Sequence, residues 1–218
     1  MLPNAYGTFK KRGDHIFRTE ARLQWGNSND SLGLIIMLNP GSSKLGEPTQ
    51  WQKFLDKDGD YEAIDQELEM DDTMLAIAYI LELSHPNLLG YLEIRNLFNL
   101  RTEQAKAKVA IDEYNGLMSQ PLYEDVLYNT FTDLDHFPWV WLAWTVDPSP
   151  VIKKRKVHIL KRLNQAKWIF ALCKEPPHDM EFKEYYCYHP YPQIPKQVKW
   201  YRDGMVQQMQ DYWKRMRG

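Results

Sequence analysis

Three uncharged polar side chains each follow a short apolar or aromatic stretch, and they are the first candidates for chemistry. Asn39 follows the apolar run at residues 32–38 and precedes a Pro-Gly-Ser-Ser turn. Asn96 lies at the end of a second run, at residues 91–97, and His189 follows an aromatic stretch at residues 185–188. An amide presents both a hydrogen-bond donor and an acceptor, and so does a neutral imidazole. These groups can recognise a polar ligand, although asparagines at strand ends and histidines in turns also bond nearby backbone.

The elements that must hold these residues follow from the alternation of apolar and polar segments. Short unbroken apolar runs bounded by turn residues are typical of strands buried on both faces. Three such runs lie at residues 32–38, 139–144 and 168–173, and a further strand is predicted at residues 91–97. Helices are expected from Asp71, from Thr102 to about 114, from 119 to about 134, and from Val151. We therefore predict an α/β domain with a mostly parallel four-stranded central sheet flanked by helices.

In such a sheet the carboxyl ends of the strands meet at one edge, where ligands bind. Asn39, Asn96, Thr145 and His189 are predicted to gather there. The remaining segments frame this core as one domain over residues 1–218. They are an N-terminal hairpin within 1–30, the core at 31–195 with a long polar loop at 44–61, and a C-terminal helix at 196–218.

Further residues have both a functional and a structural interpretation. Trp51 and Phe54 are the conspicuous apolar residues of the polar loop, and they either stack on a ligand or pin the loop down. Asp71 and Asp72 suit the first turn of a helix, where the dipole favours negative charge, but a catalytic carboxylate is the alternative. The helix from Val151 has a basic exposed side that either contacts nucleic acid or is simply solvated. Its residues are Lys153, Lys154, Arg155, Lys156, Lys161 and Arg162.

Composition excludes several classes of protein. The net charge of −2 argues against a protein that coats nucleic acid nonspecifically. No apolar run approaches the ~20 residues that a membrane span needs, and the first residues lack the pattern of a secretion signal. Two cysteines and scattered histidines indicate neither a disulfide framework nor a metal site. We expect a cytoplasmic monomer without cofactor or metal.

The ordered motifs resemble an uncharacterised prokaryotic and phage family, the domain-of-unknown-function family numbered sixteen forty-three. That family's pattern runs MLNPS, DDPT, NLF-x-LR, AWG and HPLY. The corresponding segments here are Met37–Gly41, Asp71–Thr73, Asn96–Arg101, Ala143–Thr145 and His189–Tyr191. This resemblance spans roughly residues 6–195 and names no activity.

A more distant resemblance is to the uracil-DNA glycosylase superfamily, whose members share a three-layer fold with a parallel central sheet. Its mismatch-specific branch has GINPG after the first core strand, and Met37–Gly41 is similar. The superfamily has an asparagine after its second strand, often LWG after its third, and HPSPLS near its end. Asn96, Ala143–Thr145 and His189–Ile194 stand at those places.

This resemblance implies a DNA glycosylase that flips a base out of the helix and hydrolyses its bond to the sugar. His189 would stabilise the departing base as an anion, Asn96 would read a pyrimidine edge, and Asn39 would position the attacking water. Ile194 would wedge into the base stack. Phosphate and backbone contacts are expected from Ser42, Ser43, Lys44, Ser149, Tyr191 and the basic residues Lys153 to Lys156.

Departures from the superfamily's pattern shape the expected substrate. Where this chain has Gly41, the strict uracil enzymes have a tyrosine that blocks 5-substituted bases. The expected substrate is therefore a modified or mismatched pyrimidine, for example a 5-substituted cytosine of phage DNA. Trp51 and Phe54 are further candidates to line the base pocket. Asn39 cannot act as a general base, and Asp71 or Asp72 is the alternative source of one. Two other functions stay open, a nucleoside or nucleotide N-glycosidic hydrolase and a non-catalytic nucleic-acid-binding protein.

Overall fold

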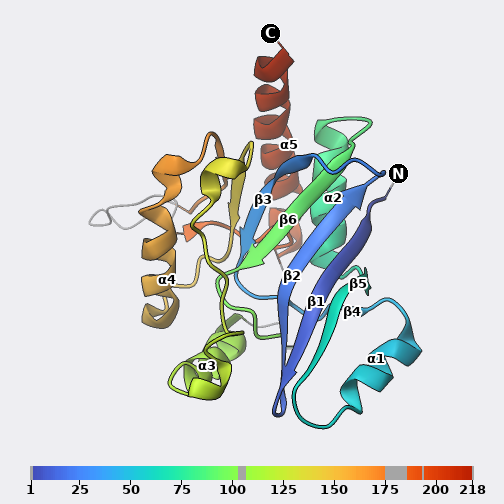
Figure 1. The fold of residues 1–218 in the computed structure, drawn as a ribbon. Coiled ribbons are helices and arrows are strands. Elements are labelled where there is room, and N and C mark those ends of the chain that lie inside the picture. The colour runs from blue at the N-terminus through green and yellow to red at the C-terminus, as the bar shows by residue number, and fades with distance from the viewer. Residues whose placement is uncertain (1, 103–106, 175–185, 193, 218) are drawn as a thin grey trace.

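The computed structural model describes residues 2–102, 107–174, 186–192 and 194–217 of the chain. Eight strands hydrogen-bond side by side in the order β4-β5-β1-β2-β6-β3-β7-β8. Five α-helices and three short 3₁₀ turns complete this part of the chain (Figure 1). The strands are β1 (Asn4–Arg12), β2 (His15–Trp25), β3 (Ser31–Met37), β4 (Lys44–Leu45), β5 (Tyr61–Glu69), β6 (Gly90–Asn96), β7 (Val140–Ala143) and β8 (Ile169–Ala171).

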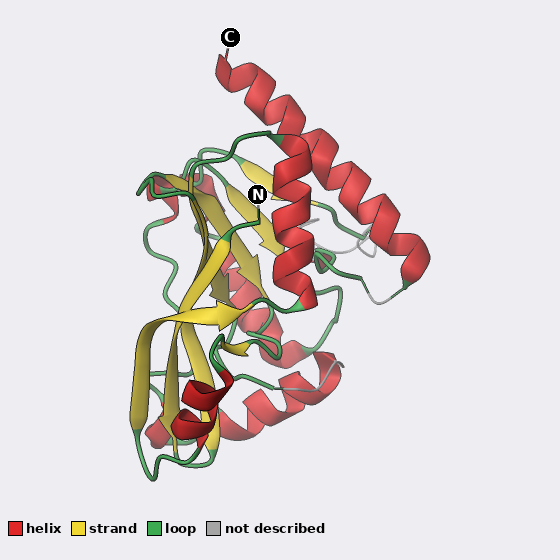
Figure 2. Cartoon of the chain, turned by 90° about the vertical axis from the view of Figure 1, so that its right-hand side faces the viewer, coloured by secondary structure: helices red, strands yellow, loops and turns green. Residues whose placement is uncertain are grey.

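One half of the sheet is parallel and covered on both faces. Strands β6, β3, β7 and β8 run in the same direction. Helices α2 (Asp72–Ser84) and α5 (Pro195–Arg217) pack together against one face, as Figure 2 shows. Helices α3 (Ala107–Leu117) and α4 (Pro150–Leu160) cover the other face. Successive side chains of a strand point to opposite faces. Ile35 and Met37 therefore enter the first core, and Leu34 and Ile36 enter the second.

The other half of the sheet is antiparallel. Strands β1 and β2 form the N-terminal hairpin, with Gly13 in the left-handed conformation that its tight turn requires. β5 pairs with the outer side of β1, and β4 pairs with β5. Because β2 also pairs antiparallel with β6, the hairpin continues the central sheet rather than standing apart from it.

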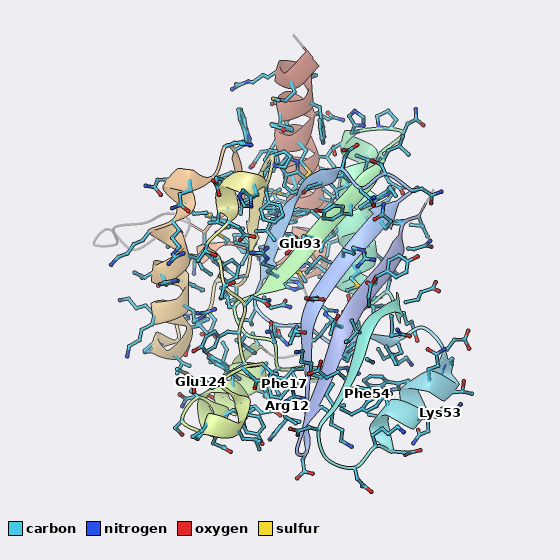
Figure 3. All side chains as sticks on the ribbon, in the orientation of Figure 1. Arg12, Phe17, Lys53, Phe54, Glu93 and Glu124 are labelled. Atoms are coloured by element: carbon cyan, nitrogen blue, oxygen red, sulfur yellow. The ribbon has the colours of Figure 1, made fainter. Side chains whose placement is uncertain are left out.

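Helix α1 (Pro48–Leu55) covers one end of the antiparallel half. Its Phe54 is buried against Phe9 of β1, with ring centroids 6.1 Å apart, and it stacks on Trp51 at 5.4 Å. Figure 3 shows Phe54 on the side of α1 that faces the sheet, whereas Lys53 points outward. These aromatic contacts anchor a helix whose other residues are largely polar.

The structure corrects the predicted fold class. A mostly parallel four-stranded sheet is wrong, because the sheet has eight strands and four of its seven strand pairings are antiparallel. The predicted loop at 44–61 contains β4 and α1 and reaches the start of β5. The predicted helix at 119–134 is also wrong, since that segment contains only the 3₁₀ turn at Pro121–Tyr123 and the start of another at Leu134–His136.

Candidate functional site

Strands β3, β6 and β7 end in register at one edge of the parallel half. Met37, the last residue of β3, is paired with Asn96 on one side and Ala143 on the other. Asn39 follows Met37 by two residues. The Asn96 side chain is 1% exposed, and its Oδ1 has no hydrogen-bond partner among the described residues. Buried polar atoms in proteins are usually bonded, so this oxygen marks a position where the donor of a ligand would be accepted.

The turn after β3 brings its backbone close to the start of α2. Gly41 has a φ of 68°, a backbone conformation that residues other than glycine rarely adopt. A Cβ atom placed on Gly41 would lie only 2.9 Å from Oδ2 of Asp71. Glycine is therefore required here both by the backbone conformation and by the approach of the carboxylate.

Asp71 begins α2 as its N-cap. Its Oδ1 accepts a hydrogen bond from the backbone N–H of Met74 at 2.9 Å, which satisfies one of the unpaired donors in the first helical turn. The start of the helix predicted at Asp71 is confirmed. Because Oδ2 faces Gly41 at the strand ends, the capping role and a role at the site are compatible in one carboxylate.

His189 reaches the site through a return of the chain beyond β8. Tyr188 donates its backbone N–H to the carbonyl of Leu172 at 2.8 Å, and Cys187 forms an antiparallel bridge with Cys173. Burial lowers the pKa of His189 below the ordinary imidazole value, against the opposing effects of a hydrogen bond to Tyr191 and of the charge of Asp71. The imidazole is therefore neutral at pH 7.

Tyr191 offers Nδ1 of His189 either a donor or an acceptor, and the choice between the two sets the tautomer. Nδ1 of His189 lies 3.3 Å from the backbone nitrogen of Tyr191 and 3.2 Å from its carbonyl oxygen. When Nδ1 accepts the N–H of Tyr191, the single hydrogen of the neutral ring is on Nε2. Nε2 is then a hydrogen-bond donor, which is what stabilisation of an anion requires.

Two arginines that the sequence did not single out lie beside the same turn. Arg18 of β2 is 1% exposed and donates from Nη1 to the hydroxyl of Ser43, while its Nε and Nη2 have no partner among the described residues. Arg101 donates to the carbonyls of Ser43 at 2.8 Å and Ser42 at 2.9 Å, and lies 4.9 Å from the ring centroid of Trp51. Burial lowers the pKa of Arg18 to about 10, with Asp71 raising it and Arg101 lowering it further.

The basic stretch on α4 is smaller than predicted. Lys156 is completely buried and donates to the carbonyls of Thr145 at 2.9 Å and Asp147 at 3.2 Å, so its predicted place on the exposed side is wrong. Arg155 donates to the carbonyl of Asn129 at 2.7 Å and is partly buried. Lys153 and Lys154 are exposed. Two lysines, rather than four cations, are presented to solvent by this stretch.

The other predicted residues are distributed around the turn. Ser42 is exposed, Ser43 is buried, and Lys44 forms an ion pair with Glu69 at 3.2 Å. Ile194 is 55% exposed and Tyr191 is 41% exposed, so both are available to a partner. Trp51 lies near the turn because its ring contacts Arg101, whereas Phe54 is buried in the core. Ser149 precedes α4 as its N-cap, and Gln193 of the last motif lies outside the described residues.

The cavities and possible metal ligands of the described residues add no further residues to the candidate site. Two hollows of about 430 and 580 Å³ lie over the antiparallel strands and beside α1, and their lining residues do not include Asn39, Asn96 or His189. Within the described ranges, no group of three or more His, Cys, Asp or Glu side chains could hold a metal ion. No helix of the described chain is long and apolar enough to cross a membrane.

Comparison with known proteins gives no family. Neither models of protein families, nor curated proteins, nor solved structures match this chain. The site presents a neutral imidazole, a carboxylate, an amide with an unbonded oxygen, and two guanidinium groups around one turn. This set can recognise a polar ring, assist the attack of water, and attract an anion.

Proposed function

We propose that the protein is a DNA glycosylase that flips out and hydrolytically excises a modified or mismatched pyrimidine. The observation that carries the proposal is the Asp71 carboxylate at the turn that follows β3, within electrostatic reach of His189, which follows the segment paired beyond the end of β8. The resemblance of the motifs at Met37–Gly41, Asn96 and His189–Ile194 to the uracil-DNA glycosylase superfamily supports it further.

The proposed reaction breaks the bond between the sugar C1′ and the base nitrogen. The electron pair of that bond leaves with the base, and a hydrogen bond from Nε2 of His189 stabilises the resulting anion. Water then adds to C1′ of the sugar cation and gives a proton to Asp71, whose carboxylate supplies the base that the Asn39 amide cannot. Asn39 positions that water, and Asn96 accepts a hydrogen bond from the flipped base. The products are a free base and an abasic site.

Gly41 makes the proposed base pocket permissive. Where the strict uracil enzymes that the chain resembles have a blocking tyrosine, this chain has Gly41, so no tyrosine rejects a substituent on the base. We therefore propose that the substrate is a 5-substituted or otherwise enlarged pyrimidine, such as the modified cytosines of phage DNA, which suits a role in antiviral defence or in a phage.

A base-release assay tests this function. Duplex and single-stranded oligonucleotides would carry uracil, mismatched thymine, 5-hydroxymethylcytosine or glucosylated cytosine, and alkali would reveal abasic sites. With the correct base, we expect His189→Ala and Asp71→Asn each to lower the rate by at least about 100-fold. Asn39→Ala should also slow the reaction. His158→Ala, an exposed histidine on α4, is the matched control and should keep the wild-type rate.

The assay also defines the results that contradict the proposal. Absence of abasic sites on every substrate, with folded protein, would refute glycosylase activity. Equal rates for His189→Ala and the His158→Ala control would remove His189 from the mechanism. Salt-dependent binding of DNA without base release would instead favour a non-catalytic nucleic-acid-binding protein.

A second candidate is an N-glycosidic hydrolase of free nucleosides or nucleotides. The observation that favours it is the burial of Lys156 and the partial burial of Arg155, which reduces the cationic surface available to a DNA backbone. Release of base from nucleotides, without binding of oligonucleotides, would identify this activity.

A further inference from the structure

Arg18 is an unusual cation for a protein interior. Two of its guanidinium nitrogens, Nε and Nη2, are buried and have no hydrogen-bond partner among the described residues. Its one bond goes to the neutral hydroxyl of Ser43. The carboxylate of Asp71 acts electrostatically on Arg18, but the two described side chains do not form an ion pair. Burying a charge costs several kcal/mol unless a partner compensates it, so this side chain is poorly explained by a structural role.

Arg101 extends the same cationic site toward the surface. It binds the backbone carbonyl of Ser43, while Arg18 binds the hydroxyl of that residue, so the two guanidinium groups flank one serine. Strand pairing fixes this arrangement, because Arg18 donates its backbone N–H to Asn99 and Arg101 donates its own to Ile16. Arg101 is only partly buried, and Ser42 beside it is exposed. Arg101 therefore reaches solvent at the turn, whereas Arg18 lies behind it.

We propose that Arg18 and Arg101 form a binding site for a phosphate group, with the Ser43 hydroxyl as a third contact. A guanidinium fork matches a phosphate through two parallel N–H···O bonds. A phosphate also has enough oxygens to accept from Nε and Nη2 of Arg18 and from Arg101 together. Opening of the Ser42–Ser43 turn would admit it to Arg18.

The position of this site specifies its place in the proposed reaction. Ser43 lies two residues after Gly41, which the Asp71 carboxylate approaches, so the phosphate site borders the proposed catalytic groups. Resting on the proposed function, we assign to it a phosphate of the flipped nucleotide's own backbone. The same chemistry would hold the phosphate of a free nucleotide if the second candidate function is correct.

Binding measurements test the site independently of catalysis. Inorganic phosphate would be titrated into wild-type protein and into Arg18→Met, Arg18→Lys and Arg101→Gln by calorimetry, with thermal unfolding in parallel. We expect phosphate to bind the wild type and raise its melting temperature. Each variant should lose at least about tenfold in affinity, since a hydrogen bond to a charged group contributes on this scale. Arg22→Gln is the control, because Arg22 lies on the same strand but is paired with Asp65 at the surface.

Two further arms identify the source of the phosphate. Fluorescence anisotropy would follow a labelled 12-nucleotide single strand and duplex, with deoxynucleoside monophosphates as competitors. Loss of DNA affinity in the Arg18 and Arg101 variants supports a backbone phosphate. Loss of monophosphate affinity alone supports a free nucleotide. Either result supports the site even when no base is released, so failure of the proposed glycosylase would be recognised separately.

The inference would be overturned by two results. One is wild-type protein that binds neither inorganic phosphate nor either phosphate-bearing probe. The other is unchanged phosphate and DNA affinity in folded Arg18→Met and Arg101→Gln. If Arg18→Met fails to fold, Arg18→Lys carries the test, because it keeps the charge and removes the planar fork.

Discussion

Arg18 and Arg95 lie on neighbouring strands, and the surroundings of their guanidinium groups differ completely. Arg95 of β6 forms two parallel bonds with Asp133, at 2.6 and 2.8 Å, and a third with Glu93 at 2.6 Å. Although burial alone would lower its pKa, Asp133 and Glu93 raise it. Arg18 has one serine partner, and burial lowers its pKa to about 10. The contrast indicates that Arg95 serves stability, whereas Arg18 is held ready for a ligand.

The largest effect on stability is expected at the paired arginine. Arg95→Met would leave the partly buried Asp133 and Glu93 without their cation and should lower the free energy of unfolding by about 2–3 kcal/mol. Urea denaturation would measure it. Arg22→Met is the control, and its more exposed pair with Asp65 should contribute less than about 1 kcal/mol. Equal losses of stability in both variants would contradict the distinction between the partly buried ion pairs of Arg95 and the more exposed pair of Arg22.

Lys156 offers an intermediate case, since this buried cation has backbone carbonyl partners. Burial lowers its pKa to about 8, against smaller opposing effects of Cys187 and Asp147. Between that value and the ordinary 10.5, the unfolded chain holds the proton and the folded chain does not. The free energy of unfolding should therefore rise by about 2 kcal/mol between pH 8 and about pH 10.

The control for this pH dependence is substitution of Lys156 itself. In Lys156→Met, the rise in the free energy of unfolding with pH should be smaller by about 2 kcal/mol. Lys154 is exposed on the same helix, so Lys154→Met should keep the wild-type dependence on pH. Measurements stop at about pH 10 because burial raises the pKa of Tyr114, and loss of a tyrosine proton from the unfolded chain reverses the trend. A wild type whose stability is flat over this range would contradict the prediction.

A smaller effect on stability is expected at Gly41, where the backbone approaches Asp71. Asp71 is the carboxylate that acts electrostatically on Arg18. Gly41→Ala should cost about 1 kcal/mol from the positive φ alone, plus the cost of moving Asp71. Gly59→Ala is a matched control, since its φ of 67° is almost the same but a Cβ there meets nothing within 4 Å. The difference between the two variants in thermal unfolding isolates the contact with Asp71.

The smallest loss of stability is expected at Arg18, and it is the most direct test of the comparison. Because Arg18→Met removes a buried charge without leaving a carboxylate unpaired, stability should stay within about 0.5 kcal/mol of wild type or increase. Chemical denaturation beside Arg95→Met gives the measurement. A loss as large as that of Arg95→Met would mean that Arg18 is structural.

The sequence predicted some elements because their signal is local. The unbroken apolar run before Asn39 marks a strand buried on both faces, and Asp71 marks a helix start by capping it. Helix α1 and strand β5 gave no such signal, since their residues are mostly polar and their stability depends on Phe9 and on pairing with β1. The join between β2 and β6 is also a long-range property, which is why the sheet was predicted with too few strands.

The residues of the candidate site also divide into those with a local sequence signal and those that only tertiary packing reveals. Asn39, Asn96 and His189 were found because each follows a recognisable apolar or aromatic segment. Arg18 was not, because an arginine at one position of a hairpin strand looks the same whether it faces solvent or the interior. Lys156 was misplaced for a related reason, as a run of four cations does not reveal which one turns inward. Only tertiary packing decides these two cases.

The close approach of Gly41 to Asp71 also constrains how this protein can evolve. A larger side chain after β3 would narrow the entrance to the proposed base pocket, yet it would collide with the carboxylate that caps α2. A single substitution therefore cannot restrict the substrate range without also disturbing the start of a core helix. Selectivity and folding are coupled at this position, so a narrower specificity would have to arise through compensating changes at both residues.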